Sequence, residues 1–257
     1  MTLLSVNDLS VQRGNRTTLN KVSFSAEGGE LIGIVGPNGS GKSTLLKAIL
    51  GLLPHSGMAM VEGKHVSAFS LNERARRMAY LPQNREVAWG VTVKDLVALG
   101  RAPYSQAFGA SNAAEMIKVE AALRSMEVTH LRESSATQIS GGELARVLTA
   151  RALAQETPLL FADEPNAGLD PAHQIHLMSI LQRVASEGQT ILVSLHDLNL
   201  AARWCSRLLV ISEGTLVADG APQETLGEQV LRDVFGIEAF RGEDAQGTVI
   251  VPVRRVT

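Results

Sequence analysis

Short, mostly apolar runs recur along the chain and predict a buried parallel sheet. Each run holds four or five residues, and together they cover residues 31–35, 77–81, 159–162, 190–194 and 207–211. Continuous apolar runs of this length are typical of strands that are buried on both faces. The chain is therefore expected to have an α/β fold.

The N-terminal part of the chain shows a different pattern. Residues 3–30 have the character of short strands, separated by turn sequences at Arg13-Gly14-Asn15 and Glu27-Gly28-Gly29. A further hairpin-like piece is expected at residues 58–61, directly before Glu62-Gly63. Strand segments punctuated by glycine turns are typical of antiparallel sheets. We therefore expect an antiparallel β layer in addition to the parallel sheet.

Between residues 83 and 155 the apolar positions follow a helical period. Four side chains on one helical face are expected to pack as ordinary core: Met116, Val119, Leu123 and Met126. Two segments resemble capping boxes, in which a side chain bonds the backbone N–H three residues further on: Thr92-x-x-Asp95 and Asn112-x-x-Glu115. The stretch is expected to form an inserted helical lobe.

These patterns predict a single domain over residues 1–257. Residues 1–83 and 156–257 would form its core, and residues 84–155 would form the helical lobe. After Ser212-Glu213-Gly214 we expect a strand, a helix at about residues 223–235 and a β-like tail at residues 248–253.

Composition narrows the possible partners and location. The 257 residues carry a formal net charge of −2, so there is no basic excess of the kind that follows a nucleic-acid backbone. The single cysteine, Cys205, excludes an internal disulfide and is expected to be a small packed residue in a reducing compartment. The N-terminus lacks a basic leader, and Lys47 interrupts the longest apolar run. We expect a cytosolic protein that reaches a membrane only through a partner.

The segment after the run at residues 31–35 carries the pattern G-x-x-x-x-G-K-[ST], which is typical of a loop that binds nucleotide triphosphates. Its residues are Gly36-Pro37-Asn38-Gly39-Ser40-Gly41-Lys42-Ser43-Thr44. The glycines let successive backbone N–H groups point inward, which forms an anion site at the start of the next helix. Lys42 is expected between the β- and γ-phosphates of ATP, and the Ser43 hydroxyl is expected to bind Mg²⁺.

Two acidic residues, Asp163 and Glu164, directly follow the apolar run at residues 159–162. At the end of a strand, Asp163 can hold Mg²⁺, and Glu164 can orient and deprotonate the attacking water. Paired acids after a strand are common on protein surfaces. The phosphate-binding loop elsewhere in the same chain is what favours a catalytic interpretation.

The segment Ser140-Gly141-Gly142-Glu143 precedes a helical run at residues 144–154. A capping box explains Ser140 and Glu143, because each side chain can bond the other residue's backbone N–H. It does not explain two consecutive glycines, which weaken a first helical turn unless a ligand approaches the backbone closely. We therefore predict a second phosphate site at this helix start.

The stretch Ile139-Ser140-Gly141-Gly142-Glu143 closely resembles the LSGGQ signature of ABC-type ATPases. In that family the signature of one subunit closes over ATP held by the other. The resemblance implies a head-to-tail dimer of this chain with two composite ATP sites. It also implies a P-loop NTPase core with a mixed sheet, an N-terminal antiparallel layer and an inserted helical lobe.

Three further segments resemble motifs of the family, in the family's order. Gln83, in Tyr80-Leu81-Pro82-Gln83, takes the place of the glutamine that touches Mg²⁺ and water. Asp170, at the end of Asn166-Ala167-Gly168-Leu169-Asp170, takes a place near the dimer seam. His196, in Ser194-Leu195-His196-Asp197, takes the place of the histidine that contacts the γ-phosphate. Glu164, His196 and Gln83 are thus the implied catalytic groups.

The chain departs from the family pattern at three places. Where the family usually offers an aromatic ring to the adenine, the chain has Arg13. Its guanidinium could stack on the base, the base could be held weakly, or Arg13 could be a solvated turn residue. The signature ends in Glu143, and Ala167-Gly168 stands where a serine-alanine pair is usual. We expect neither of these two changes to abolish hydrolysis.

Three segments are similar to the ABC ATPases that power import of iron–siderophore, haem and cobalamin: residues 92–104, 169–174 and 196–202. The resemblance covers all three substrates, because the ligand never touches this subunit. It implies a peripheral protein on the cytoplasmic face of the inner membrane. Integral-membrane permease subunits would dock on residues 84–110, with Tyr104 at an exposed position, and a periplasmic binding protein would be an indirect partner.

Two alternatives stay open at this point. One is a soluble ABC ATPase of an assembly system, for example in iron–sulfur cluster building. The other is a motor for lipid or lipopolysaccharide export. Residues 84–110 discriminate between these alternatives and import, because an importer needs this lobe to seat a helix from a membrane permease.

Overall fold

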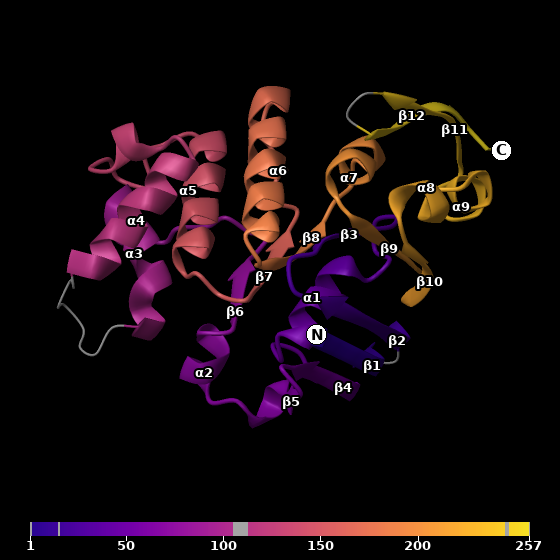
Figure 1. The fold of residues 1–257 in the computed structure, drawn as a ribbon, viewed down its shortest axis with the longest axis horizontal. Coiled ribbons are helices and arrows are strands. Elements are labelled where there is room, and N and C mark those ends of the chain that lie inside the picture. The colour runs from indigo at the N-terminus through magenta and orange to yellow at the C-terminus, as the bar shows by residue number, and fades with distance from the viewer. Residues whose placement is uncertain (1, 15, 105–112, 245–246, 257) are drawn as a thin grey trace. The chain divides into compact units, whose positions relative to one another are not determined.

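The computed structural model describes residues 2–14, 16–104, 113–244 and 247–256. Its contacts divide the chain into two compact units, Met1–Phe69 with Gln182–Thr257, and Ser70–Leu181. We describe each unit by itself (Figure 1). The predicted division into a core of residues 1–83 and 156–257 and a lobe of residues 84–155 stays a prediction.

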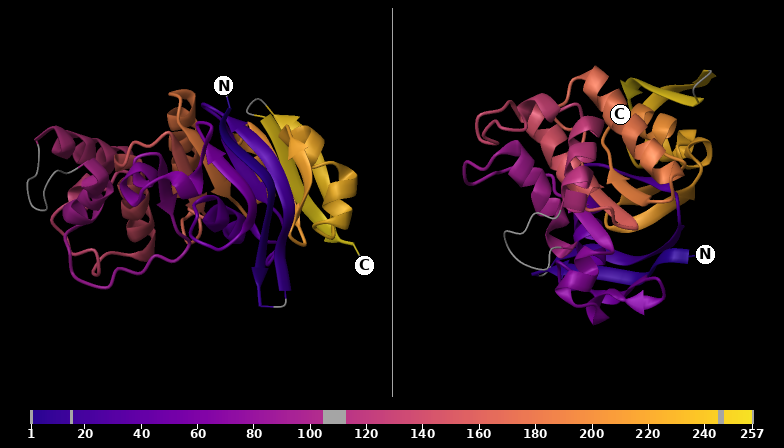
Figure 2. Two further views of the ribbon diagram at one scale, coloured as in Figure 1. Left: turned by 90° about the horizontal axis from the view of Figure 1, so that it is seen from below. Right: turned by 60° about the vertical axis from the view of Figure 1, so that its left-hand side comes forward.

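The first unit contains an antiparallel sheet with the strand order β2-β1-β4-β5. Its strands are β1 (Thr2–Arg13), β2 (Arg16–Glu27), β4 (Ser56–Val61) and β5 (Lys64–His65). Buried and exposed side chains alternate along the second half of β2, so one face of the sheet is buried. The long strands β1 and β2 lie side by side in indigo in Figure 2. The predicted antiparallel layer is confirmed, although β1 and β2, at 12 residues each, are longer than expected.

The first unit also holds four strands in the order β10-β9-β3-β8. They are β3 (Leu31–Val35), β8 (Thr190–Ser194), β9 (Arg207–Ser212) and β10 (Thr215–Gly220). Strand β3 runs parallel to both β8 and β9, and β10 runs antiparallel to β9. Every residue of β3 and β8 is buried, which confirms these predicted strands. Helix α1 (Lys42–Ile49) follows β3 and starts at the predicted phosphate-binding loop.

The C-terminal part differs from the prediction at one point. The expected helix at residues 223–235 is two short helices, α8 (Pro222–Thr225) and α9 (Glu228–Asp233). The helix breaks because Leu226, fully buried, leaves the helical region and Gly227 is extended. The predicted tail is strand β12 (Gly247–Arg255), which pairs with β11 (Ile237–Asp244) as a hairpin beside α7 (Leu198–Trp204) (Figure 1).

The second unit combines two parallel strands with a group of helices. The strands are β6 (Met78–Leu81) and β7 (Leu159–Asp163), and both were predicted. The helices are α2 (Leu71–Ala75), α3 (Val93–Ala98), α4 (Ala113–Ser125) and α5 (Gly141–Ala154), with 3-10 turns at Leu99–Tyr104 and Thr129–Leu131. Helix α6 (Pro171–Ser186) begins in this unit and ends in the other.

The helical predictions for this unit hold where the structure describes the residues. Thr92 caps α3, because its hydroxyl accepts a hydrogen bond from the Asp95 N–H at 3.1 Å. The predicted cap Asn112 lies outside the described residues. Of the apolar stripe on α4 and the turn after it, Val119, Leu123 and Met126 are buried and Met116 is half-buried, as a core role requires.

Candidate functional site

The predicted site residues fall into both units. The first unit holds Arg13, the loop of residues 36–44 and His196, and the second holds Gln83, residues 140–143, Asp163, Glu164 and Asp170.

The loop between β3 and α1 is shaped by glycines that no other residue could replace. Gly36 has φ +155°, and a Cβ there would lie 2.0 Å from the carbonyl oxygen of Ile211. Gly41, the N-cap of α1, has φ +112°, and a Cβ would lie 2.7 Å from the Leu19 side chain. A side chain would also be strained at such φ values. The loop thus stays tight and leaves its backbone N–H groups at the start of α1.

Two polar side chains of the loop indicate an anion. Lys42 is 5% exposed, and its ammonium group donates to the carbonyl oxygens of Gly36 at 2.7 Å and Pro37 at 3.1 Å. The Ser40 hydroxyl is buried and has no hydrogen-bond partner among the described residues. Buried hydroxyls are nearly always hydrogen-bonded in native proteins. A phosphate oxygen would supply the partner that Ser40 lacks, so the loop fits the predicted ligand.

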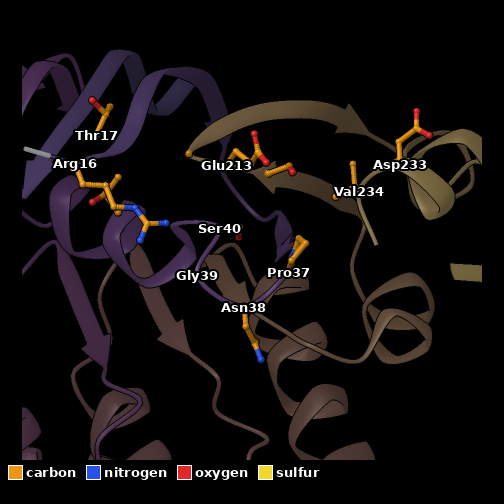
Figure 3. A pocket seen from close by; sticks show the side chains of 12 residues that line it. Arg16, Thr17, Pro37, Asn38, Gly39, Ser40, Glu213, Asp233 and Val234 are labelled. Carbon is orange, nitrogen blue, oxygen red and sulfur yellow. The ribbon is translucent and has the colours of Figure 1, made fainter. Parts of the chain in front are cut away.

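A cavity of about 500 Å³ lies against this loop. It lies within the usual size range of small-molecule sites, roughly 300–1,000 Å³. Its walls come from the start of β2, the loop, the β9–β10 turn and the end of α9: Arg16, Thr17, Thr18, Pro37, Asn38, Gly39, Ser40, Ser212, Glu213, Gly214, Asp233 and Val234. Figure 3 shows the loop flanked by Arg16 on one side and Asp233 on the other.

The cavity includes an arginine, but a different one from the arginine predicted to meet the base. Arg13, at the end of β1, is exposed and is not among the lining residues, whereas Arg16 lines the cavity. The two residues are opposite each other in the β1–β2 register. Both arginines flank one tight turn, so the residue pattern gave no sign of which of them borders the cavity.

His196 lies where the sequence predicts, at the edge of the sheet next to the loop. Its preceding residue, Leu195, donates its N–H to the carbonyl oxygen of Ile34 at 3.0 Å. Strands β3 and β8 run parallel, so the residues after both strands come to the same edge. Asp197 then caps α7, accepting a hydrogen bond from the Leu200 N–H at 2.9 Å. His196 is exposed between these two fixed points.

In the second unit the ends of β6 and β7 bring Gln83 and the two acids together. The Gln83 side-chain amide donates to a carboxylate oxygen of Glu164 at 2.8 Å. Asp163 is almost fully buried, and the Tyr80 hydroxyl lies 3.4 Å from one of its oxygens. Burial and, second, the Asp163 charge raise the pKa of Tyr80 well above its usual value, so Tyr80 stays a proton donor. The structure thus brings Gln83 and Glu164 into direct contact.

Glu164 has an unusual backbone. Its φ is +50°, in the left-handed region that non-glycine residues seldom occupy. Such strain persists only where the surroundings enforce it, and it concentrates at functional sites. Here Arg85 lies against the turn that follows, donating to the carbonyl oxygens of Glu164 and Pro165 at 3.1 and 3.0 Å. Sequence reasoning missed Arg85, because backbone acceptors have no residue-type signature.

The predicted second phosphate site has the geometry of a capping box. The Glu143 N–H donates to the Ser140 hydroxyl at 3.3 Å, and the Ser140 N–H donates back to the Glu143 carboxylate at 2.8 Å. Hydrogen bonds from the Ser140 side chain and backbone lower the pKa of Glu143. Both glycines have ordinary negative φ values, and a Cβ on Gly141 would meet nothing within 4 Å. Nothing within the described chain therefore requires glycine at position 141.

Asp170 caps the start of α6. One of its carboxylate oxygens accepts from the His173 N–H at 3.0 Å, and the other lies 2.6 Å from His173 Nδ1. These hydrogen bonds, the backbone one first, lower the pKa of Asp170. The cap explains the residue structurally, and its expected place at a dimer seam stays a prediction.

The predicted docking segment, residues 84–110, is described up to residue 104. Trp89 is 67% exposed, and Leu99 also exposes an apolar side chain. The expectation that Tyr104 is exposed is wrong: it is half-buried, and the Arg101 guanidinium lies 4.0 Å from its ring centroid. Arg101 itself is buried. It also donates to the Ala154 carbonyl oxygen at 2.7 Å, and this bond fixes the segment to the end of α5.

No helix in the described part of the chain is long and apolar enough to cross a membrane. No cluster of three or more histidine, cysteine, aspartate or glutamate side chains in the same part could hold a metal ion.

Comparison with known proteins matches this chain to ABC transporters and to ATP-binding proteins of importers. The family described as ABC transporter matches residues 19–167. The hemin import ATP-binding protein HmuV of Pseudomonas fluorescens (strain Pf0-1) is 42% identical over 244 residues, which are 93% of this chain and 94% of that protein. The cobalamin import ATP-binding protein BtuD of Halobacterium salinarum (strain ATCC 29341 / DSM 671 / R1) is 39% identical over 251 residues, which are 96% of this chain and 63% of that longer protein.

The fold also matches a solved structure. A metal-chelate type ABC transporter in an inward-facing conformation superposes with a TM-score of 0.84 at 25% sequence identity. The match covers 99% of this chain and 98% of the other. It confirms the fold predicted from the sequence, with parallel strands, an antiparallel β layer and helices.

Proposed function

We propose that this chain, which belongs to the ABC transporter family and is an ATP-hydrolysing subunit, powers a membrane importer for iron–siderophore, haem or cobalamin. The observation that carries the proposal is the 42% identity with a hemin import ATPase over nearly the whole of both chains. The other two proteins compared above carry a cobalamin import and a metal-chelate description. The three ligands are large and chelated, and one type of motor can serve all of them.

In this proposal, ATP places its phosphates on the loop of residues 36–44. Lys42 moves from the loop carbonyls to the β- and γ-phosphates, which are stronger partners for an ammonium group. Ser43, Gln83 and Asp163 would hold Mg²⁺ through a hydroxyl, an amide and a carboxylate oxygen, the hard ligands that this ion prefers. Glu164 accepts the proton of the attacking water, and His196 contacts the γ-phosphate.

The second half of each ATP site comes from a second copy of the chain. The open space at Gly141 supports this, because glycine is needed there only if something outside the chain approaches the backbone. Ser140, Gly142 and Glu143 complete the segment that would close over the partner's ATP. Asp170 lies near the seam of this head-to-tail dimer.

The nucleoside is expected to occupy the cavity beside the loop, with Arg16 on its wall. A guanidinium stacked on a base is worth about 0.5–1 kcal/mol, so Arg16→Ala should weaken ATP binding a few-fold. Arg13→Ala on the other side of the turn is the matched control and should change ATP affinity less. Calorimetry with ATP on both variants decides between them. A loss confined to Arg13→Ala would assign the base contact to Arg13 instead.

The permease is expected to dock on residues 84–110 at the cytoplasmic face of the inner membrane, where the chain is a peripheral subunit. The exposed apolar side chains of Trp89 and Leu99 support this, because large exposed apolar groups serve as anchors in interfaces. A periplasmic binding protein would deliver the ligand to the outer side and touch this chain only indirectly.

Trp89→Asp should abolish uptake of the transported chelate while most ATPase activity of the isolated subunit remains. The reason is that a charge replaces an exposed apolar anchor without disturbing the packed lobe. Ile117→Asp on α4 is a matched control, because Ile117 and Trp89 are both 67% exposed. Uptake of labelled siderophore, haem and cobalamin is measured in cells that carry each variant.

The import proposal fails if deleting the gene leaves all three uptakes intact. Collapse of a soluble assembly pathway, such as iron–sulfur cluster building, would then indicate an assembly ATPase. Loss of outer-membrane lipid would indicate an export motor. Normal uptake with Trp89→Asp alone would overturn only the docking assignment.

A further inference from the structure

Arg85 makes a set of contacts that the functions assigned above do not use. It is half-buried and lies two residues after Gln83. Its guanidinium donates to three carbonyl oxygens that all belong to one turn. Nη1 reaches Ala167 at 2.5 Å, and Nη2 reaches Glu164 and Pro165 at 3.1 and 3.0 Å. All three acceptors belong to the turn of residues 164–170, which we call the acidic turn. Arg85 thus bonds three carbonyl oxygens in the first part of the turn. Gln174 Nε2 donates to two others, those of Asn166 at 3.4 Å and Leu169 at 3.0 Å.

The acidic turn needs such a partner. Its own backbone hydrogen bonds are few, with Ala167 N–H donating to the Glu164 carbonyl oxygen at 3.2 Å and Leu169 N–H donating to that of Asn166 at 3.2 Å. The turn starts from the left-handed backbone of Glu164, which is unfavourable by itself. Three carbonyl oxygens that converge on one point repel one another unless a donor lies between them. The planar, five-donor guanidinium suits this geometry, and a lysine ammonium does not match it.

The acidic turn also reaches the signature segment of the same chain. A Cβ built on Gly142 would lie 3.9 Å from both the carbonyl oxygen of Gly168 and the Leu169 side chain. The turn therefore lies between Arg85 and the start of α5. Its two ends are Glu164, which bonds Gln83, and Asp170, which caps α6.

The geometry points to Arg85 as a positioning residue for ATP hydrolysis, which holds the acidic turn so that Glu164 and Asp170 keep their catalytic and dimer-facing places. The inference rests on the proposed role of Glu164 as the base. Arg85 acts through the turn and touches no reacting atom. Burial lowers the pKa of Arg85 and the Glu164 charge opposes that shift, while the guanidinium of arginine remains a cation in proteins.

Arg85 also lies at the start of the docking segment. A permease that displaces residues 84–104 would move the guanidinium away from the three carbonyl oxygens or press it closer. The same side chain then links transport to the position of the catalytic base.

The test compares Arg85→Met and Arg85→Lys with the control Arg77→Met in the purified full-length chain. Arg77 is a half-buried arginine that donates to the Glu73 carbonyl oxygen, at the opposite end of β6 from Gln83. We expect Arg85→Met to lower kcat roughly 10- to 100-fold, the cost of a base held slightly out of place, while KM for ATP changes less than about twofold. Arg85→Lys should restore part of kcat, and Arg77→Met should retain it.

A second readout separates positioning from general loss of stability. Amide hydrogen exchange should accelerate at residues 166–169 in Arg85→Met, while exchange in β6 and β7 stays as in the unaltered protein. The inference is overturned if Arg85→Met keeps its kcat or if it raises KM alone. A normal rate in Glu164→Gln would instead overturn the proposed role of Glu164, so the two failures are distinguishable.

Discussion

Glu164→Gln is expected to slow ATP hydrolysis by about 10²–10⁴-fold while ATP binding persists, the range that follows loss of a general base. The amide keeps the size of the carboxylate but cannot accept a proton from water. The phosphate-binding loop lies in the other unit and is unchanged, so the nucleotide still binds. In the proposed head-to-tail dimer, the variant should accumulate in the ATP-bound dimeric form, because the bound ATP is no longer removed by hydrolysis. Turnover rates and size-exclusion chromatography with ATP measure the two effects.

A suitable control is Glu187→Gln. Glu187 lies on the turn after α6 and forms an exposed ion pair with Arg183 of that helix, so the substitution removes one exposed carboxylate. Exposed ion pairs contribute little, about 0.2–1 kcal/mol, so this variant should keep normal turnover. Near-normal turnover in Glu164→Gln, with or without a co-purified permease, would remove Glu164 from the role of base.

The sequence predicts those parts of the site that depend on local spacing. The loop around Lys42 needs glycines and a lysine at fixed offsets, and the structure gives them the expected strand-loop-helix context. Gln83 and Glu164 are 81 residues apart, yet each follows a strand with a clear apolar run, and the parallel pairing of β6 and β7 brings them to one edge. The other motifs, at residues 139–143, 166–170 and 194–197, were identified only through the resemblance to ABC-type ATPases.

The parts that sequence reasoning missed depend on backbone positions. Arg85 bonds carbonyl oxygens, and every residue has one, so no residue type marks the acceptor. Arg16 borders the cavity and Arg13 does not, although the two residues are opposite each other in the β1–β2 register. Tyr104 was expected to be exposed, but a buried arginine packs on its ring. The break between α8 and α9 occurs at Gly227, which the apolar pattern around it conceals.

Lys42→Ala is expected to weaken ATP binding and hydrolysis together by about 10²–10³-fold, the usual cost of removing one preorganised group from a charged transition state. The lost ammonium would neutralise the β- and γ-phosphates both before and during the reaction. Titration calorimetry with ATP and steady-state turnover measure the two effects. Lys47→Ala, in the last turn of the same helix, is the control and should retain both.

The fold should survive Lys42→Ala even though the side chain is buried. The substitution removes the hydrogen bonds of Lys42 to the carbonyl oxygens of Gly36 and Pro37. Hydrogen bonds to a charged group contribute about 1.5–3 kcal/mol, against a total of roughly 5–15 kcal/mol for a folded domain. Chemical denaturation should therefore show a lower midpoint with an unchanged slope. Undiminished ATP affinity would contradict the assignment of the loop. An unfolded variant would show that the main role of Lys42 is to stabilise the folded loop and not to bind the nucleotide.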